Sequence, residues 1–371
     1  MADAGAQDIT RGFNRRLICW NVRPRLTTGV PRSVAVAACL AVGLLAGSSV
    51  AATASPRVRL VATGGTIGNA RDGRWTADAL AASAPNLSAI AQIETETFAR
   101  GPSLALSLDD WVHLAIRLNQ IAADSTLDGI VVTSGTDTLE ELAWFLDLTV
   151  RTPKPIVLTG AIRKPGDASS DGPANLEDSV RVAASPAARG RGTMVVFHGL
   201  VLSARDVEKV STVKVEAFDA GAHAPLGSVS DGVVAFTGEN ARRHGMTSEF
   251  DIGQISRLSR VDLLLTYQGA PGDLAEAALA KGASGLVMAA AGAGALSIGE
   301  ISAVNVALKA GVPVVVASRG EDGHVSLLEG GAAPGLIAAG DLAPLKARVL
   351  LMLALSKGLD LPGVARVFRE Y

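Results

Sequence analysis

From residue 57 onward the chain alternates short apolar runs with longer amphipathic segments. Apolar or β-branched runs, typical of strands buried on both faces, occupy residues 58–63, 129–133, 155–159 and 193–197, and the first of them is interrupted only by Arg59. Apolar residues at helical spacing occur at 107–124, 139–150 and 174–184. Ser107 and Asp110 have the spacing of a capping box at the start of the first of these helices. Strands alternating with helices predict an α/β fold with a doubly wound, mainly parallel sheet.

A stretch rich in Gly and Ser, Gly221–Asp251, interrupts this alternation, and its apolar run Val233–Phe236 predicts a hairpin. Beyond it we expect further strands at 261–266, 285–289 and 313–317, and helices at 273–281, 298–310, 344–356 and 361–371. We therefore predict a larger N-terminal domain at 55–240, a linker at 241–260 and a smaller C-terminal α/β domain at 261–371.

Residues 1–54 differ in composition from the rest. They hold six arginines, no lysine, two acidic residues and both cysteines, Cys19 and Cys39. An uncharged apolar run from Ser33 to Gly47 precedes Ala52-Thr-Ala54, which has the small residues of a signal cleavage site. We expect a signal peptide cleaved near Ala54, and hence a periplasmic or secreted protein. A membrane anchor is the alternative, since the run approaches the ~20 residues that span a bilayer.

Residues 55–371 carry 28 basic and 34 acidic side chains and no cysteine. The missing thiol excludes a disulfide, a thiolate nucleophile and a cysteine-bound metal in this part of the chain. The acidic balance lacks the basic excess of a nucleic-acid-binding protein. The five histidines show no paired i, i+4 spacing. We expect neither a metal ion nor a nucleic acid as partner.

A glycine-rich segment, Thr63-Gly-Gly-Thr-Ile-Gly68, directly follows the first predicted strand. Ligands of open parallel sheets bind at such carboxyl ends of strands. The backbone N–H groups of this segment could cradle a phosphate, or its glycines could simply allow a tight turn. It lacks the spacing of the dinucleotide fingerprint and the Gly-Lys-Ser/Thr ending of a P-loop, which disfavours a nucleotide-binding module.

A second polar segment, Ser134–Glu141, follows the strand at 129–133. Thr138 and Glu141 have the spacing of a capping box, which would only start a helix. That interpretation leaves Thr136 and Asp137 unexplained, although a hydroxyl beside a carboxylate can bind a polar ligand or orient a proton relay. A threonine nucleophile needs a neighbouring base, and a desolvated lysine can provide one.

Five motifs together resemble the bacterial L-asparaginases, most closely the exported type II branch. They are Ala62-Thr-Gly-Gly-Thr-Ile67, Ser134-Gly-Thr-Asp-Thr-Leu-Glu-Glu141, Thr159-Gly-Ala-Ile-Arg163, Asp171-Gly-Pro-Ala-Asn175 and Arg205-Asp-Val-Glu-Lys209. The match spans 57–371 and includes the ending Lys346-Ala-Arg-Val-Leu-Leu351. This resemblance implies hydrolysis of the side-chain amide of L-asparagine to L-aspartate and ammonia, without a cofactor.

The resemblance also implies roles for individual residues. The catalytic positions are Thr66 as nucleophile, with Thr136, Asp137 and Lys209 as a supporting cluster. The substrate-binding positions are Ser103, Gly135, Thr136, Asp137 and Ala161. Ser103 would hold the substrate α-carboxylate and Asp137 its α-ammonium group. Backbone N–H groups near Thr66 or Thr136 would stabilise the oxyanion. Family members commonly form tetramers, built as dimers of intimate dimers, and this implies a homo-oligomer.

Three departures from the family pattern concern the substrate. The segment between Thr66 and Pro85 is short, and Arg74 or Trp75 stands near the family's lid tyrosine. Leu104 replaces a glutamine that touches the α-ammonium group, and Ala270 replaces an asparagine from the neighbouring subunit. Each lost contact weakens binding by about 1 kcal/mol, so we expect low glutaminase activity. A binding protein that kept the pocket but lost turnover is the alternative from another functional class.

Overall fold

The computed structural model describes residues 55–326 and 335–371. The predicted signal peptide at 1–54 lies outside these residues. Within the two described ranges, no helix combines the length and the apolar character that crossing a bilayer requires.

An eight-stranded sheet forms the centre of the larger, N-terminal part, in the order β12-β11-β8-β7-β6-β5-β1-β4. Its parallel strands are β1 (Arg57–Ala62), β4 (Gln92–Thr97), β5 (Gly129–Thr133), β6 (Ile156–Thr159) and β7 (Thr193–Phe197). Antiparallel strands β8 (Leu200–Ser203), β11 (Gly227–Ser230) and β12 (Val233–Phe236) complete it. The predicted doubly wound, mainly parallel sheet is thereby confirmed, as is the hairpin at Val233–Phe236.

The antiparallel edge depends on tight turns. His198 and Gly199 both have positive φ, 47° and 75°, between β7 and β8, and Asp231 and Gly232, at 49° and 76°, join β11 to β12. Two successive residues with positive φ match the type I′ turn that suits the twist of a hairpin. Strand β8 was not expected, because its four residues immediately follow another strand and add little apolar pattern of their own.

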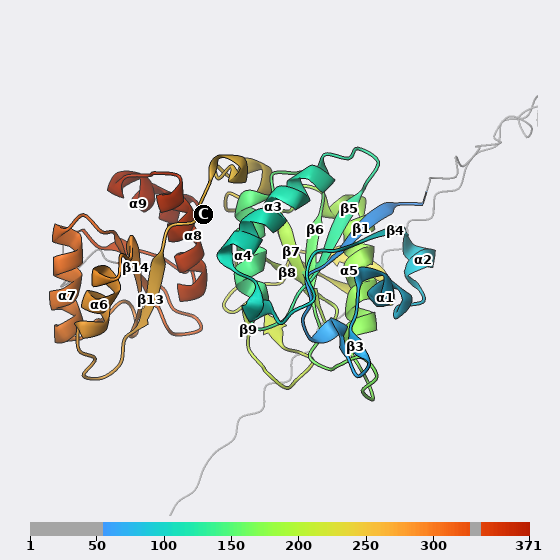
Figure 1. The fold of residues 1–371 in the computed structure, drawn as a ribbon, viewed down its shortest axis with the longest axis horizontal. Coiled ribbons are helices and arrows are strands. Elements are labelled where there is room, and N and C mark those ends of the chain that lie inside the picture. The colour runs from blue at the N-terminus through green and yellow to red at the C-terminus, as the bar shows by residue number, and fades with distance from the viewer. Residues whose placement is uncertain (1–54, 327–334) are drawn as a thin grey trace, which may run out of the picture. The chain divides into compact units, whose positions relative to one another are not determined.

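Helices cover both faces of this sheet (Figure 1). On one face lie α3 (Leu108–Ala122) and α4 (Leu139–Thr149), and on the other α1 (Ala77–Ala82), α2 (Leu87–Ile90) and α5 (Gly172–Ala184). Alternate strand residues point to opposite faces, so Val132 joins the core under α3 and α4 while Val131 joins the core under α5. The central strands β5, β6 and β7 are consequently buried on both sides.

The helix starts test the two predicted capping boxes. At α3 the Ser107 hydroxyl accepts from the Asp110 N–H at 3.1 Å while the Asp110 carboxylate accepts from the Ser107 N–H at 2.8 Å, which confirms the first box. At α4 a helix does begin after Thr138, as the capping interpretation of this segment required, but Thr138 makes no side-chain capping bond. The carboxylate of Glu141 instead lies 3.5 Å from Arg348 Nη1 in a later part of the chain.

The smaller, C-terminal part has a four-stranded parallel sheet in the order β13-β14-β15-β16. Its strands are β13 (Val261–Leu265), β14 (Gly285–Ala290), β15 (Val314–Ser318) and β16 (Ile337–Ala338), and its helices α6 (Asp273–Ala280), α7 (Ile298–Lys309), α8 (Pro344–Ser356) and α9 (Leu361–Glu370). This confirms a second, smaller α/β unit. Helix α8 packs against both this sheet and α4.

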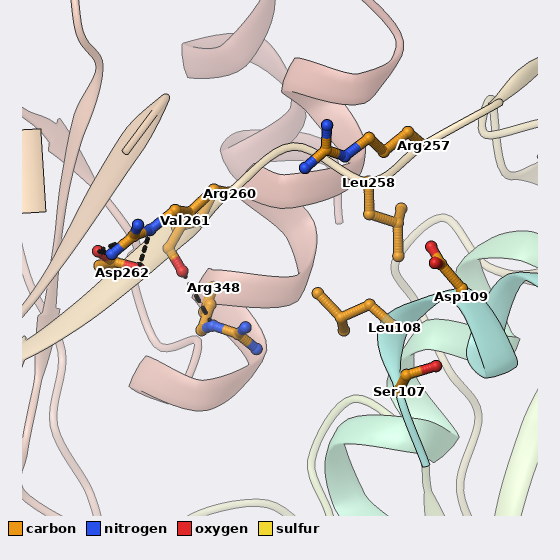
Figure 2. A pocket seen from close by; sticks show the side chains of 9 residues that line it. All are labelled: Ser107, Leu108, Asp109, Arg257, Leu258, Arg260, Val261, Asp262 and Arg348. Atoms are coloured by element: carbon orange, nitrogen blue, oxygen red, sulfur yellow. Dashed lines mark hydrogen bonds and ion pairs between the residues drawn. The ribbon is translucent and has the colours of Figure 1, made fainter. Parts of the chain in front are cut away.

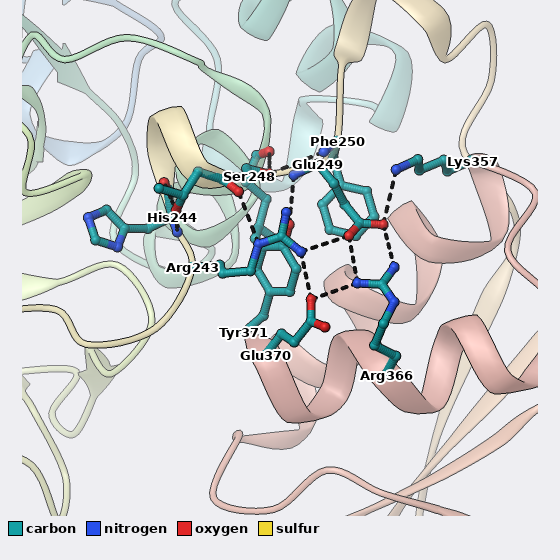
Figure 3. A network of polar contacts seen from close by, with 11 residues as sticks. Arg243, His244, Ser248, Glu249, Phe250, Lys357, Arg366, Glu370 and Tyr371 are labelled. Carbon is teal, nitrogen blue, oxygen red and sulfur yellow. Dashed lines mark hydrogen bonds and ion pairs between the residues drawn. The ribbon is translucent and has the colours of Figure 1, made fainter.

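Between β12 and β13, Glu249 forms the centre of a charged network (Figure 3). Its carboxylate accepts from Arg366 at 2.8 Å, from Arg243 at 2.8 Å and from Lys357 at 3.0 Å. These three cations, with the hydrogen bond from Arg366 contributing most, lower the pKa of Glu249 to about 2. The network fastens residues 243–249 to α9 and to the end of α8.

The strand order reverses beside β1. The chain passes from β1 to β4 on one side and then returns to β5 on the other. In open α/β sheets the crevice beyond the carboxyl ends of the strands at such a switch point is the usual ligand site. The segments that follow β1 and β5 therefore begin the candidate site.

Candidate active site

The loop after β1 is a tight turn that delivers Thr66. Gly64 and Gly65 have φ of 105° and 89°, a region that L side chains rarely adopt. The Gly65 N–H donates to the Gly101 carbonyl at 3.0 Å. Thr66, partly exposed, then opens a 3-10 helix at Thr66–Gly68. The two glycines are thus required by the backbone, and Thr66 lies at their exit.

Close contacts at Gly65 and Gly135 join three of the predicted segments. A Cβ on Gly65 would lie 2.4 Å from the N and Cα atoms of Gly135. A Cβ on Gly135 would lie 2.8 Å from the Ser103 hydroxyl oxygen, and Ser103 is only 5% exposed. The structure therefore brings together the loops that carry Thr66, Gly135 and Ser103, which lie far apart in sequence.

Lys209 connects to the segment after β5. It lies in the two-residue strand β9 (Glu208–Lys209), paired with β10 (Phe218–Asp219). Its ammonium donates to the Thr136 hydroxyl at 2.8 Å and to the Asp137 carboxylate at 2.7 Å. The Lys209 side chain is 13% exposed whereas that of Asp137 is 70% exposed. The cluster is largely shielded from solvent at the lysine and open at the carboxylate.

This geometry suits proton transfer at a hydroxyl. Because Lys209 donates to Thr136 Oγ1, the proton of the Thr136 hydroxyl must point away from Lys209. In its neutral form the same nitrogen can accept that proton, which is the role of a general base. The exposed carboxylate of Asp137 keeps acceptor capacity for a cationic group that arrives from solvent.

The turn that contains Ala161 is built by Asp171, ahead of α5. The Asp171 carboxylate accepts from the backbone N–H groups of Ile162 at 3.0 Å and Arg163 at 2.8 Å. Asn175 donates to the same carboxylate and to the Gly160 carbonyl, both at 3.1 Å. Ala161 is fully buried. Asp171 thus accepts three hydrogen bonds, one of them from Asn175, and these contacts depend on the fold rather than on the motif in which both residues occur.

Glu140 is a further residue that sequence reasoning missed. Its carboxylate accepts from the Lys209 backbone N–H at 2.9 Å. The only signal in the sequence was its place in the Ser134–Glu141 motif, to which no role for Glu140 was attached. The structure shows that Glu140 fixes the strand that presents Lys209.

The structure also shows where the three departures from the family pattern lie. Residues 69–74 form a small hairpin of β2 (Asn69–Ala70) and β3 (Gly73–Arg74), and the Trp75 indole donates to Asp72 at 3.2 Å. Leu104 is 77% exposed, so its side chain fills no pocket within the chain. Ala270 is 4% exposed. Neither Leu104 nor Ala270 carries a side-chain hydrogen-bonding group.

A separate hollow of about 360 Å³ lies outside this site (Figure 2). Its lining is Ser107, Leu108, Asp109, Arg257, Leu258, Arg260, Val261, Asp262 and Arg348. Arg348 donates to the Val261 carbonyl at 3.1 Å and Arg260 pairs with Asp262 at 2.7 Å. Arg260 and Arg348 are held by these chain contacts, and no candidate catalytic residue lines the hollow. Over residues 55–326 and 335–371, no group of three His, Cys, Asp or Glu side chains is placed to hold a metal ion.

Two family models together match most of the chain. The N-terminal asparaginase family model matches residues 57–242, and the glutaminase/asparaginase C-terminal domain model matches residues 260–368. The chain belongs to the asparaginase family. Membership supports an amidohydrolase that acts on a small molecule, in agreement with the resemblance found in the motifs.

Asparaginase relatives match nearly end to end. L-asparaginase 2 of Bacillus subtilis is 36% identical over 85% of this chain and 87% of that protein. The glutaminase-asparaginase of Pseudomonas fluorescens is 36% identical over 94% of this chain and 100% of its own length. The crystal structure of a probable cytoplasmic L-asparaginase from Campylobacter jejuni superposes with a TM-score of 0.82 at 36% identity, covering 85% of this chain and 100% of that one.

These asparaginase comparisons correct one prediction. The expectation of a periplasmic or secreted protein is wrong, because the similar solved structure is that of a probable cytoplasmic enzyme. The segment on which that expectation rested, residues 1–54, lies outside the described part of the chain.

Proposed function

We propose that this chain hydrolyses the side-chain amide of L-asparagine to L-aspartate and ammonia. The observation that carries the proposal is the hydrogen-bonded cluster of Lys209 with Thr136 and Asp137, at the strand ends that also hold the Thr66 turn. Family membership supports the reaction class. A threonine mechanism fits a part of the chain that has no cysteine.

The reaction proceeds by two acyl transfers. The Thr66 oxygen attacks the amide carbon and its proton passes to a base, after which the C–N bond breaks and the nitrogen leaves, protonated, as ammonia. The resulting β-aspartyl ester on Thr66 is attacked by water, and the ester C–O bond breaks to release aspartate and restore the hydroxyl. Lys209 and Thr136 handle the protons, and backbone N–H groups near Thr66 and Thr136 stabilise the oxyanion.

The same strand ends provide substrate binding. Asp137, with its exposed carboxylate, binds the α-ammonium group, and Ser103 beside Gly135 binds the α-carboxylate. The backbone of the Ala161 turn aligns the amide. These contacts fix both ends of a short amino acid, so that the amide carbon lies near the Thr66 oxygen.

Preference for asparagine over glutamine is the finer part of the proposal. Leu104 and Ala270 offer no polar side chain toward the α-ammonium group, so the substrate relies on fewer anchors. A substrate longer by one methylene loses more from inaccurate anchoring, which predicts low glutaminase activity. Since one relative is named a glutaminase-asparaginase, kcat/KM for both amino acids must be measured. Comparable values would contradict this preference.

We also propose that each chain has two domains, at 55–240 and 261–371, joined by residues 241–260. We further propose that the chain forms a homo-oligomer, a tetramer built as a dimer of intimate dimers. Light scattering of the purified chain measures the assembly. A monomer at micromolar concentration with full activity would contradict it.

Ammonia release from L-asparagine by the wild type and by Thr66→Ala tests the function. We expect loss of at least 10³-fold in kcat for Thr66→Ala, and near-unchanged activity for the control Thr212→Ala at an exposed position. No ammonia from the folded wild type, together with saturable L-asparagine binding, would instead identify a binding protein. Stabilisation by NAD or ATP but not by L-aspartate would identify a nucleotide-binding module.

A further inference from the structure

The segment that carries Lys209 is held from the C-terminal part of the same chain. Arg205, 5% exposed, donates to Asp341 at 2.6 Å and to Asp206 at 3.0 Å. Strand β9 itself spans only two residues. So short a strand has little rigidity of its own, and contacts from outside it must determine where the Lys209 side chain lies.

Lys346 makes the most deeply buried of these contacts. It lies in the first turn of α8, is 1% exposed and donates its ammonium to the Val207 carbonyl, two residues before Lys209. Its own carbonyl accepts from the Trp144 indole of α4 at 3.2 Å. Lys346 is therefore fixed at its backbone and bonded at its tip to the segment that leads to Lys209.

The positive charge of Lys346 also affects how the segment that carries Lys209 is held. An isolated buried ammonium is costly, and burial lowers the pKa of Lys346 to about 8. The nearby carboxylates of Glu140 and Glu208 favour its charged form. Glu140 in turn accepts the Lys209 N–H at 2.9 Å. One buried cation thus bonds one end of the segment and lies near the carboxylate that holds the other.

We infer that Lys346 is a positioning residue for Lys209: through the Val207 carbonyl and Glu140 it places the Lys209 ammonium at the Thr136 hydroxyl. This inference rests on the proposed function, in which Lys209 moves the proton. Lys346 acts from beneath the strand and touches no substrate. Its loss therefore lowers turnover and leaves substrate affinity nearly unchanged.

Lys346→Met tests the inference, since methionine nearly preserves the volume and removes the charge and the donor. We expect kcat for L-asparagine to fall 10- to 100-fold with KM within about threefold of wild type. The matched control is Arg348→Met on the same helix, whose guanidinium contacts Glu141 and Val261 instead. Its kcat should stay within about threefold. Equal losses in both variants would overturn the inference.

A double-variant cycle separates positioning from general destabilisation. On a Lys209→Met background, Lys346→Met should lower kcat less than twofold further, whereas a merely structural role would lower it by the full factor again. If Lys346→Met does not fold, Glu140→Gln replaces it, because it keeps an acceptor for the Lys209 N–H and removes the charge. It should show the same kcat loss and the same non-additivity, and full additivity would overturn the inference.

A crystal structure of Lys346→Met gives a result that needs no activity. The distance from Lys209 Nζ to Thr136 Oγ1, 2.8 Å here, should exceed 3.5 Å in the variant. An unchanged distance would refute positioning. Absence of ammonia release by the wild type would refute the proposed function instead, so the two failures are distinguishable.

Discussion

Gly65 and Gly135 are in backbone contact across the carboxyl ends of β1 and β5, and a Cβ on Gly65 would lie 2.4 Å from the Gly135 Cα. No side chain could be accommodated at Gly65 without moving one of the two loops. The contact fixes the position of the Thr66 turn relative to the Thr136 segment. The backbone conformation at Gly65 therefore helps to determine the geometry of the site.

Gly65→Ala should separate these loops. It combines a positive φ of 89° with a clash, so we expect a loss of about 2–5 kcal/mol in the free energy of unfolding and at least a 100-fold loss of kcat. Urea denaturation and ammonia release measure the two quantities. The control is Gly101→Ala, where the added Cβ meets only the Ala105 Cβ at 3.5 Å. Wild-type kcat in Gly65→Ala would show that the contact is dispensable.

Lys209→Met should abolish most turnover. It removes the donor to Thr136 and Asp137 while keeping the length of the side chain. General acid–base groups contribute about 10²–10⁴-fold, so kcat should fall by that factor. Lys214→Met, an exposed lysine five residues later, is the control. A Lys209→Met enzyme with more than a tenth of wild-type kcat would exclude Lys209 from proton transfer.

Asp171→Asn should raise KM for L-asparagine more than it lowers kcat, because it disturbs the turn that aligns the substrate. One carboxylate oxygen becomes an amide nitrogen that faces N–H donors from Ile162 and Arg163. Leaving such donors unsatisfied costs about 1–3 kcal/mol and shifts the Ala161 turn. We expect KM for L-asparagine to rise at least tenfold, measured by steady-state kinetics. Asp167→Asn, an exposed position in the same loop, should keep KM within twofold, and equal KM values in the two variants would contradict this role for Asp171.

Glu249→Gln should change how stability depends on pH. The pKa of Glu249 is lowered from an ordinary value near 4.5 to about 2, so its ion pairs stabilise the folded chain fully above pH 4.5. That contribution is lost as pH falls from 4.5 to 2. Its partners are about one-third exposed, which reduces the expected effect at pH 7 to about 1–2 kcal/mol.

Chemical denaturation at pH 7 and pH 3 measures this effect. Glu249→Gln should be less stable than wild type at pH 7, and the difference should shrink at pH 3. Glu276→Gln, at an exposed position on α6, serves as the control and should match wild type at both pH values. A pH-independent difference for Glu249→Gln would attribute the effect to packing.

The sequence by itself determined the elements and the chemistry-bearing motifs. Apolar runs such as Gly129–Thr133 have a strand as their natural conformation in a buried sheet, and the Ser107–Asp110 capping box is a local interaction that neighbouring residues specify completely. The glycines before Thr66 likewise allow a tight turn, which was one of two interpretations that the sequence left open for that segment. Family motifs then supplied the reaction class.

Only the tertiary structure decided what those motifs contact. Thr138 has the spacing of a cap but makes none, and the two acids that follow it are directed elsewhere: Glu140 to the Lys209 N–H and Glu141 toward Arg348. Lys209 reaches Thr136 across 73 residues, and Lys346 reaches Val207 across 139. Such pairings depend on which strands are adjacent in the sheet and on which segments α8 packs against. The order of residues along the chain does not specify either arrangement directly.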